Sequence, residues 1–229
     1  MGVDELIEEY NELINSSVQN ALNAPNRAFG GVLRSQKGTF VEYLGATLVK
    51  LAWNNKGGNM GKLRIDKKKI PIMIDQNYVE SLSKDVYDVL DVTEYKYGLS
   101  VDIHVFIDDK LVLGIECKAY AENAMIKRIL FDFYLLKTVK SDMKCCLLQL
   151  ESQLGGDYSD LSVVEHKGSE STHTLMSYFP NVDLNIITLL YGERKVDRPI
   201  HTKGFHKQLT KESLERALST LEELLPNPA

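Results

Sequence analysis

The sequence predicts an α/β fold in which a central mixed β-sheet lies between helices on both faces. Residues 100–118 contain two runs of alternating apolar side chains, a pattern typical of a β-hairpin. Residues 121–138 follow as a strongly apolar helix, and residues 144–150 follow as a buried strand. Because strands and helices alternate through this part of the chain, a sheet covered by helices is the natural architecture.

The chain begins with two expected helices. Residues 4–22 carry apolar side chains at helical spacing, with Asp4 as a possible N-cap. Residues 39–53 predict a second helix, and the glycine-rich residues 57–61 mark a loop after it.

The remaining elements complete the alternation. Residues 63–74 are expected to be extended, and residues 76–90 to contain a short helix. Residues 154–174 are polar and predict a long loop. Residues 183–191 predict another strand, and residues 211–225 predict a final amphipathic helix.

Length and composition indicate an ordinary globular protein. The chain has 229 residues, of which 44% are hydrophobic and 26% charged, so residues 1–229 are expected to form a single domain. No apolar run approaches the roughly 20 residues of a membrane span. The N-terminus is acidic, unlike a secretory leader. Cys145 and Cys146 are adjacent in an apolar run and predict buried thiols in a reducing cytoplasm.

The charge is unevenly distributed along the chain. The net charge is -5, and residues 1–26 contain no Lys or Arg. Residues 56–69 carry six cations against one acid, and residues 193–211 are again basic. Lys67–Lys69 is interpreted as a solvated run, with phosphate contact as the alternative. This distribution neither requires nor excludes a nucleic-acid partner.

The apolar residues of the hairpin predict its register. Their two inward sets can face one core only if an odd number of residues closes the loop, because a one-residue slip turns every side chain over. We therefore predict a three-residue loop, Asp108–Lys110. This loop would pair Ile107 with Leu111 and Ile103 with Ile115.

The same register brings two carboxylates and a lysine together. Asp102 would lie opposite Glu116 with Cβ atoms about 5 Å apart, and Lys118 would follow on the same face. Two carboxylates can hold a hard cation through oxygen ligands, and the lysine can orient an attacking water. Gly114, also on this face, is expected to leave room for a phosphate backbone. A solvated surface pair is the alternative interpretation.

Asp102, thirteen intervening residues and then Glu116-Cys117-Lys118 resemble the motif of the PD-(D/E)XK nuclease superfamily. Val101 stands where the motif has Pro, a position that varies in this family. The family includes most type II restriction endonucleases, several repair nucleases and junction resolvases. The resemblance implies a restriction-endonuclease-like fold, double-stranded DNA as substrate, 5′-phosphate products, and Mg²⁺ as cofactor, for which Mn²⁺ could substitute.

The resemblance also implies roles for individual residues. Asp102 and Glu116 would bind the metal together with the backbone carbonyl of Cys117, and Lys118 would position the attacking water. Many restriction enzymes carry a glutamate on a helix beside the site, and Glu42 in residues 39–53 resembles it. Gly45 and Ala46, one turn later, would let this helix approach closely. The catalytic core would span about residues 36–150.

Several basic residues are candidates for DNA contact. The two in residues 121–138 could contact phosphates or simply cover the helix surface, and the four after residue 193 follow a predicted strand and could reach base edges. The candidates are Lys127, Arg128, Arg194, Lys195, Arg198 and Lys203.

The predicted function is that of a type II restriction endonuclease acting as a homodimer, with the N- and C-terminal helices as candidate dimer surfaces. The alternatives are another nuclease of this fold and a non-catalytic DNA-binding protein. No nucleotide cofactor is expected, because residues 57–63 have one residue too few for a phosphate-binding loop. No HExxH motif, zinc-type cluster or GxSxG motif occurs.

Overall fold

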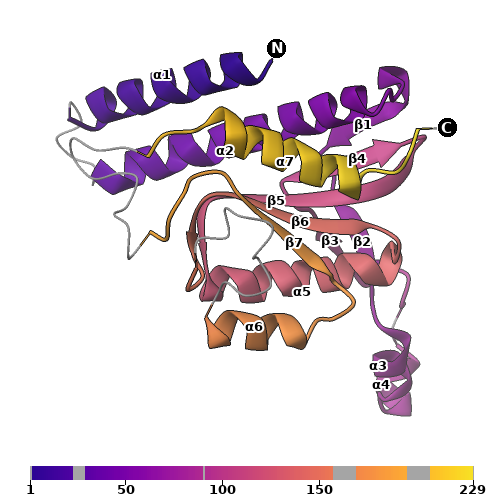
Figure 1. Cartoon of the computed structure of the whole chain (residues 1–229). Helices are drawn as coiled ribbons and strands as arrows, with labels where there is room; N and C mark the ends of the chain where they lie inside the picture. Colours follow the sequence, from indigo (N-terminus) through magenta and orange to yellow (C-terminus); the bar gives the residue numbers. More distant parts are fainter. Residues whose placement is uncertain (1, 23–28, 90, 157–168, 195–206, 229) are drawn as a thin grey trace.

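The computed structural model describes residues 2–22, 29–89, 91–156, 169–194 and 207–228. In this part of the chain a five-stranded mixed sheet lies between two layers of helices, which confirms the predicted fold class (Figure 1). The strands, in their order across the sheet, are β1 (Leu63–Asp66), β4 (Ile103–Ile107), β5 (Lys110–Glu122), β6 (Lys144–Gln153) and β7 (Leu184–Thr188). Strand β4 runs antiparallel to its two neighbours, β1 and β5, whereas β5, β6 and β7 are parallel.

Three helices cover one face of the sheet: α1 (Val3–Leu22), α2 (Phe29–Asn55) and α7 (Lys211–Leu224) (Figure 1). The predicted stripe of α1 is confirmed, since Leu6, Tyr10 and Ile14 are buried. The helix begins at Val3, so Asp4 lies in its first turn and is not the N-cap. Helix α2 begins well before residue 39, because the helical backbone continues through glycines whose low helix propensity hides it in the sequence.

The other face is covered by α5 (Asn123–Val139), with α6 (Glu170–Ser177) packed against it (Figure 1). Residues 157–168 of the predicted loop over residues 154–174 lie outside the described residues, and the prediction was wrong at the end of the loop, where α6 begins. The Oγ atom of Ser169 caps this helix by accepting the backbone N–H of Thr172 at 3.2 Å. Such a short capped helix carries little apolar periodicity, so the sequence pattern does not reveal it.

The hairpin β4–β5 closes differently from the prediction. Asp108 and Asp109 have φ angles of 48° and 61° and form a two-residue turn, so Ile107 pairs with Lys110 instead of Leu111. A β-bulge between Val105 and Phe106 then shifts the register, and Ile103 pairs with Ile115 as predicted. The extra residue of the bulge, added to the two-residue turn, gives the odd number of residues that the apolar pattern requires.

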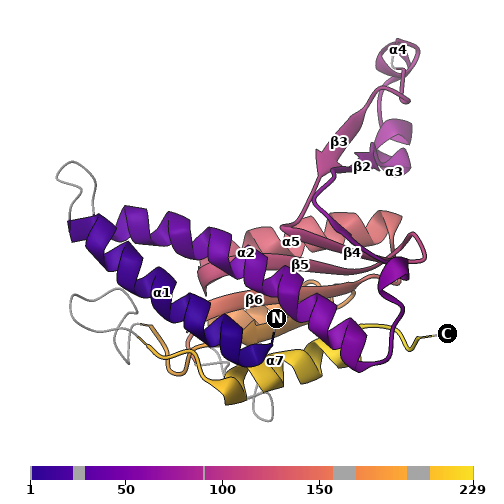
Figure 2. The ribbon, with the colours of Figure 1, turned by 90° about the horizontal axis from the view of Figure 1, so that it is seen from above.

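Residues 70–99 form an arm that projects from the body of the protein (Figure 2). The arm contains a two-stranded antiparallel sheet and two short helices, so the extended segment over residues 63–74 is divided between two sheets. Its elements are β2 (Ile70–Met73), α3 (Gln76–Glu80), α4 (Lys84–Tyr87) and β3 (Lys96–Leu99). The sequence analysis did not predict β3. The arm leaves the sheet after β1 and returns just before β4, beside Asp102.

The three cysteines are free thiols with buried side chains, and Cys145 and Cys146 are 0% exposed, as predicted. Among the described residues, no helix combines the length and hydropathy needed to cross a bilayer.

Candidate functional site

The two motif carboxylates meet where β4 begins. Asp102 directly precedes β4, and its Oδ2 atom accepts the backbone N–H of Cys117 on β5 at 2.8 Å. This side-chain hydrogen bond ties Asp102 to β5 directly beyond the last backbone pair, Ile103 with Ile115. Glu116 and Lys118 extend from the same strand on either side of Cys117.

The ammonium of Lys118 is surrounded by oxygen atoms. Its Nζ lies 2.5 Å from Glu116 Oε1, 3.3 Å from Asp102 Oδ2 and 3.1 Å from the carbonyl oxygen of Cys117. These three oxygens are the proposed metal ligands, and they already converge on one cationic group. The donor set therefore fits a hard divalent cation, which prefers oxygen ligands.

The centre has two carboxylates and one carbonyl. No group of three or more His, Cys, Asp or Glu side chains suited to a metal occurs in the described part of the chain. Such a group is not required for Mg²⁺, which usually keeps several waters and binds through one or two carboxylates together with substrate phosphate.

Burial shapes the electrostatics of the centre. The side chains of Asp102, Glu116 and Lys118 are 22%, 15% and 28% exposed. Burial raises the pKa of Glu116, an effect that Lys118 opposes and that the charges of Asp102 and Asp132 reinforce. Burial alone would lower the pKa of Lys118, but Glu116 and Asp102 outweigh it and raise this pKa. Lys118 is therefore held firmly in its charged form.

Glu42 reaches this centre through a second lysine. Its Oε2 atom lies 2.5 Å from the Nζ of Lys67, which is also 3.9 Å from Oδ1 of Asp102. Helix α2 approaches the sheet closely one turn later. A Cβ on Gly45 would lie 2.9 Å from the side chains of both Ile103 and Leu148. The expected close approach of this helix at Gly45 is thus confirmed.

Lys67 was not predicted to lie at the centre. Asp66 pairs with His104 across β1 and β4, so Lys67, the next residue after β1, lies close to Asp102. This pairing joins residues far apart in the chain, and a run of three lysines gives no sign of it. Asp132 on α5, which influences the pKa of Glu116, was missed for the same reason.

Gly114 does not have the expected role. A Cβ at this position would lie 3.0 Å from Cε1 of Phe133 and 3.3 Å from Sδ of Met143. The glycine therefore allows α5 to pack on the sheet, and no phosphate backbone can approach there.

The candidate DNA-contacting residues have different environments. Lys127 and Arg128 are exposed on α5, and Arg128 pairs with Asp132 at 3.5 Å. The Arg194 side chain is 13% exposed, and its guanidinium lies 3.8 Å from the ring centroid of Tyr120. Arg194 is therefore packed within the protein. Three other candidates, Lys195, Arg198 and Lys203, lie outside the described residues.

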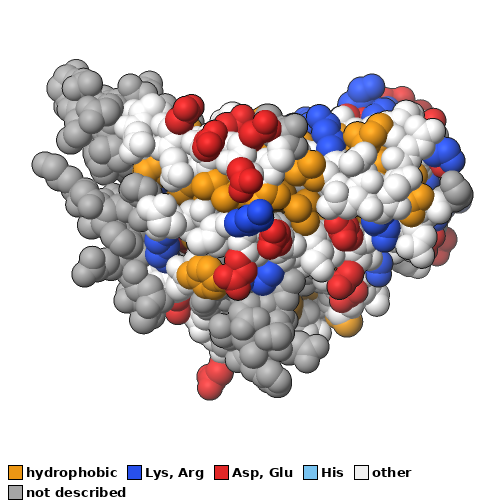
Figure 3. All heavy atoms as spheres, turned by 45° about the horizontal axis from the view of Figure 1, so that its top comes forward, with side chains coloured by type: hydrophobic (Ala, Val, Ile, Leu, Met, Phe, Trp, Pro, Cys, Tyr) orange, Lys and Arg blue, Asp and Glu red, His pale blue; other side chains and the backbone are white. Residues whose placement is uncertain are grey.

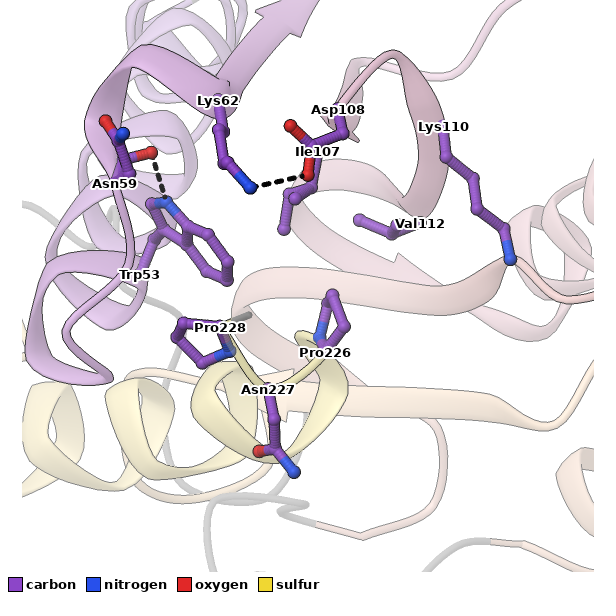
Figure 4. Close-up of a pocket in the computed structure, with 10 residues that line it drawn as sticks. All are labelled: Trp53, Asn59, Lys62, Ile107, Asp108, Lys110, Val112, Pro226, Asn227 and Pro228. Carbon is purple, nitrogen blue, oxygen red and sulfur yellow. Dashed lines mark hydrogen bonds and ion pairs between the residues drawn. The ribbon is translucent and has the colours of Figure 1, made fainter.

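A cavity of about 400 Å³ lies at the opposite end of the hairpin (Figure 4). Trp53 and the C-terminal Pro226 and Pro228 line it, together with Lys62, which pairs with Asp108 at 3.1 Å. Because this cavity borders the hairpin turn, it is separate from the carboxylate centre. Asp108 is the one carboxylate among the described residues that line it.

Comparison with known proteins gave one strong match. No family model matches the sequence. The chain is 51% identical over 228 residues to the type II restriction enzyme DdeI of Desulfomicrobium norvegicum, covering 96% of this chain and 95% of that protein. A structure of the native A2B2 tetramer of BbvCI aligns with 96% of this chain and 86% of that chain, with 11% identity and a TM-score of 0.37. The latter likeness is too weak to support a conclusion.

Proposed function

Because this chain belongs to the family of type II restriction enzymes, we propose that it cuts duplex DNA at a specific sequence with Asp102, Glu116 and Lys118 as its catalytic centre. The observation that carries this assignment of residues is the convergence of Asp102, Glu116 and the Cys117 carbonyl on one cationic group. We further assign the centre to the PD-(D/E)XK type, on the spacing and strand positions of these residues.

The proposed cofactor is Mg²⁺, held by Asp102, Glu116 and the carbonyl oxygen of Cys117, with Mn²⁺ able to replace it. When bound, a divalent cation supplies Lewis-acid activation of the phosphoryl group and of the attacking water. The N–H of Cys117 holds the Asp102 carboxylate in place, and the sheet pairing of β5 holds Glu116. The ligands are therefore positioned before substrate arrives.

Lys118 would act on the water and the phosphate. The three oxygens that would hold a divalent cation are the ones that the ammonium of Lys118 contacts in this structure. Lys118 would remain beside the reacting phosphate, where its positive charge can orient the water and stabilise developing negative charge. Glu42 would accept a hydrogen bond from the water shell of the cation.

The test is cleavage of phage DNA by the purified protein. Discrete fragments are expected in Mg²⁺, with none in EDTA and none for Glu116→Ala. The Lys118→Ala protein should bind DNA without cutting it, because its carboxylates remain. A smear that does not resolve into bands would contradict sequence specificity, and full cleavage by Glu116→Ala would contradict the assigned centre.

The active form is proposed to be a homodimer, because a two-fold protein can cut both strands of a palindrome. The terminal helices expected to form the dimer surface bury their apolar faces inside the chain. The outer side of α1 is acidic, with exposed Asp4, Glu5, Glu8 and Glu12, and acidic side chains gather on this face of the molecule (Figure 3). The terminal helices are therefore poor candidates for an apolar interface or for DNA.

The arm is a better candidate for contact with a second copy. Half of the exposed large hydrophobic residues in the described chain lie on it: Met73, Tyr78, Val86, Tyr87, Val89, Tyr95 and Tyr97. Residues 70–99 contain six acids and two lysines, a balance that disfavours contact with phosphates. Exposed apolar patches of this kind mark protein interfaces.

A further inference from the structure

Lys67 joins two carboxylates that come from opposite sides of the site. Glu42 is on α2, and Asp102 directly precedes β4. The ammonium of Lys67 lies 2.5 Å from Oε2 of Glu42 and 3.9 Å from Oδ1 of Asp102, and the Lys67 side chain is 54% exposed. The other oxygen of Asp102, Oδ2, is the one that Lys118 and the Cys117 N–H contact.

We propose that Lys67 is a positioning residue of the catalytic centre, which holds Glu42 beside Asp102 and offsets part of their negative charge. This inference rests on the proposed function of the same centre. It adds a second lysine, outside the Asp–Glu–Lys motif, at the edge of the site open to solvent.

The charges of the centre explain why a second lysine is needed. Glu42, Asp102 and Glu116 would repel one another without nearby cations, and the described centre contains two: Lys118 inside and Lys67 at the rim. The ammonium of Lys67 lies within hydrogen-bonding distance of Glu42 and within ion-pair distance of Asp102. Lys67 therefore keeps Glu42 turned toward the centre.

Loss of Lys67 should have two opposite effects. Without the ammonium, Asp102 and Glu42 offer more negative charge to a divalent cation, so cation affinity should rise. Glu42 is then no longer held in place, so cleavage should slow. Local disruption of the structure would instead weaken both cation binding and cleavage.

The experiment compares Lys67→Ala and Lys67→Arg with wild type and with Lys50→Ala, which removes the same charge from an exposed position on α2. Calorimetric titration of Mn²⁺ into the DNA-free protein measures affinity, and steady-state cleavage at saturating DNA measures kcat. Lys67→Ala should bind Mn²⁺ up to about fivefold more tightly, the upper range for a partly exposed ion pair. Its kcat should fall roughly 100-fold, as expected for a misplaced catalytic group. Lys67→Arg should recover most of this loss, and Lys50→Ala should match wild type in both measurements.

A double-mutant cycle shows whether Lys67 acts through Glu42. Lys67→Ala should cost little further kcat in a Glu42→Gln background. Full additivity, weaker Mn²⁺ binding together with slower cleavage, or no effect of Lys67→Ala would each overturn the inference. A wild-type protein that cuts no DNA would refute the proposed function, while the Mn²⁺ titrations would still support the inference if affinity rises and overturn it if affinity does not.

Discussion

Cys117 lies between the two motif residues on β5, and its backbone and its side chain have different roles. Its N–H binds Asp102 and its carbonyl oxygen contacts Lys118, whereas the thiol is buried toward α2. Burial raises the pKa of this thiol well above its usual range, so it stays protonated and is a poor metal ligand.

We therefore expect Cys117→Ala to keep metal-dependent cleavage within a few-fold of wild type. The smaller side chain leaves a gap in the core and should reduce the free energy of unfolding by about 1 kcal/mol. Cleavage rates and urea unfolding test this expectation. A loss of activity as large as that of Glu116→Ala would show that the thiol itself takes part.

Lys37 on α2 is a second residue whose environment has a measurable consequence. It is 2% exposed, and burial lowers its pKa to about 8, although the charge of Glu151 opposes the shift. Below pH 8 the folded protein must bury a charged lysine. Between that pKa and the unfolded value of 10.5, the unfolded chain binds more protons, so stability rises with pH.

Lys37→Met should therefore be more stable than wild type at pH 7, by up to about 3 kcal/mol. This difference should shrink as the pH rises from 8 toward 10.5. Urea unfolding at several pH values measures it, with the exposed Lys50→Met on the same helix as control. A difference that does not change with pH would contradict burial of the charged form.

At the scale of elements, the approach of α2 to the sheet depends on one glycine. A Cβ at Gly45 would lie 2.9 Å from the ends of Ile103 and Leu148, whereas a Cβ at Gly38 meets nothing within 4 Å. Both residues lie in the same helix, so their alanine variants form a matched pair.

Gly38→Ala should raise the free energy of unfolding by up to about 1 kcal/mol through helix propensity. Gly45→Ala gains the same propensity but overpacks the core, which costs about 1–3 kcal/mol, so it should be less stable than wild type. It should also slow cleavage, because the helix that carries Glu42 is pushed outward. Urea unfolding of both variants is the measurement, and equal stabilisation would contradict the close contact at Gly45.

The hairpin shows how an element can be predicted correctly through the wrong local geometry. The apolar residues require an odd number of residues in the connection. The prediction assigned all three to the loop, whereas the structure uses a two-residue turn and a bulge. A three-residue loop and a two-residue turn with one bulge residue both add up to an odd number of residues. The register at Asp102 and Glu116 is therefore unchanged.

For the whole molecule, the distribution of exposed apolar residues gives a test of assembly. Tyr78 on the arm is 58% exposed, and Tyr178 at the end of α6 is 78% exposed. If the arm forms the homodimer contact, Tyr78→Asp should shift the protein toward monomer in sedimentation velocity, and Tyr178→Asp should not. Equal effects of the two substitutions, or none, would place the dimer contact elsewhere.

The fold class and the pairing of Asp102 with β5 could be predicted because they depend on local periodicity, and alternation along two short strands leaves few registers. Only the tertiary structure decided that β2 and β3 leave the sheet as an arm, that Gly114 lies under Phe133, and that Lys67 and Asp132 come close to the carboxylates. These features depend on contacts between residues far apart in the chain. Neighbouring residues encode periodicity, but they do not encode which distant side chain will meet them.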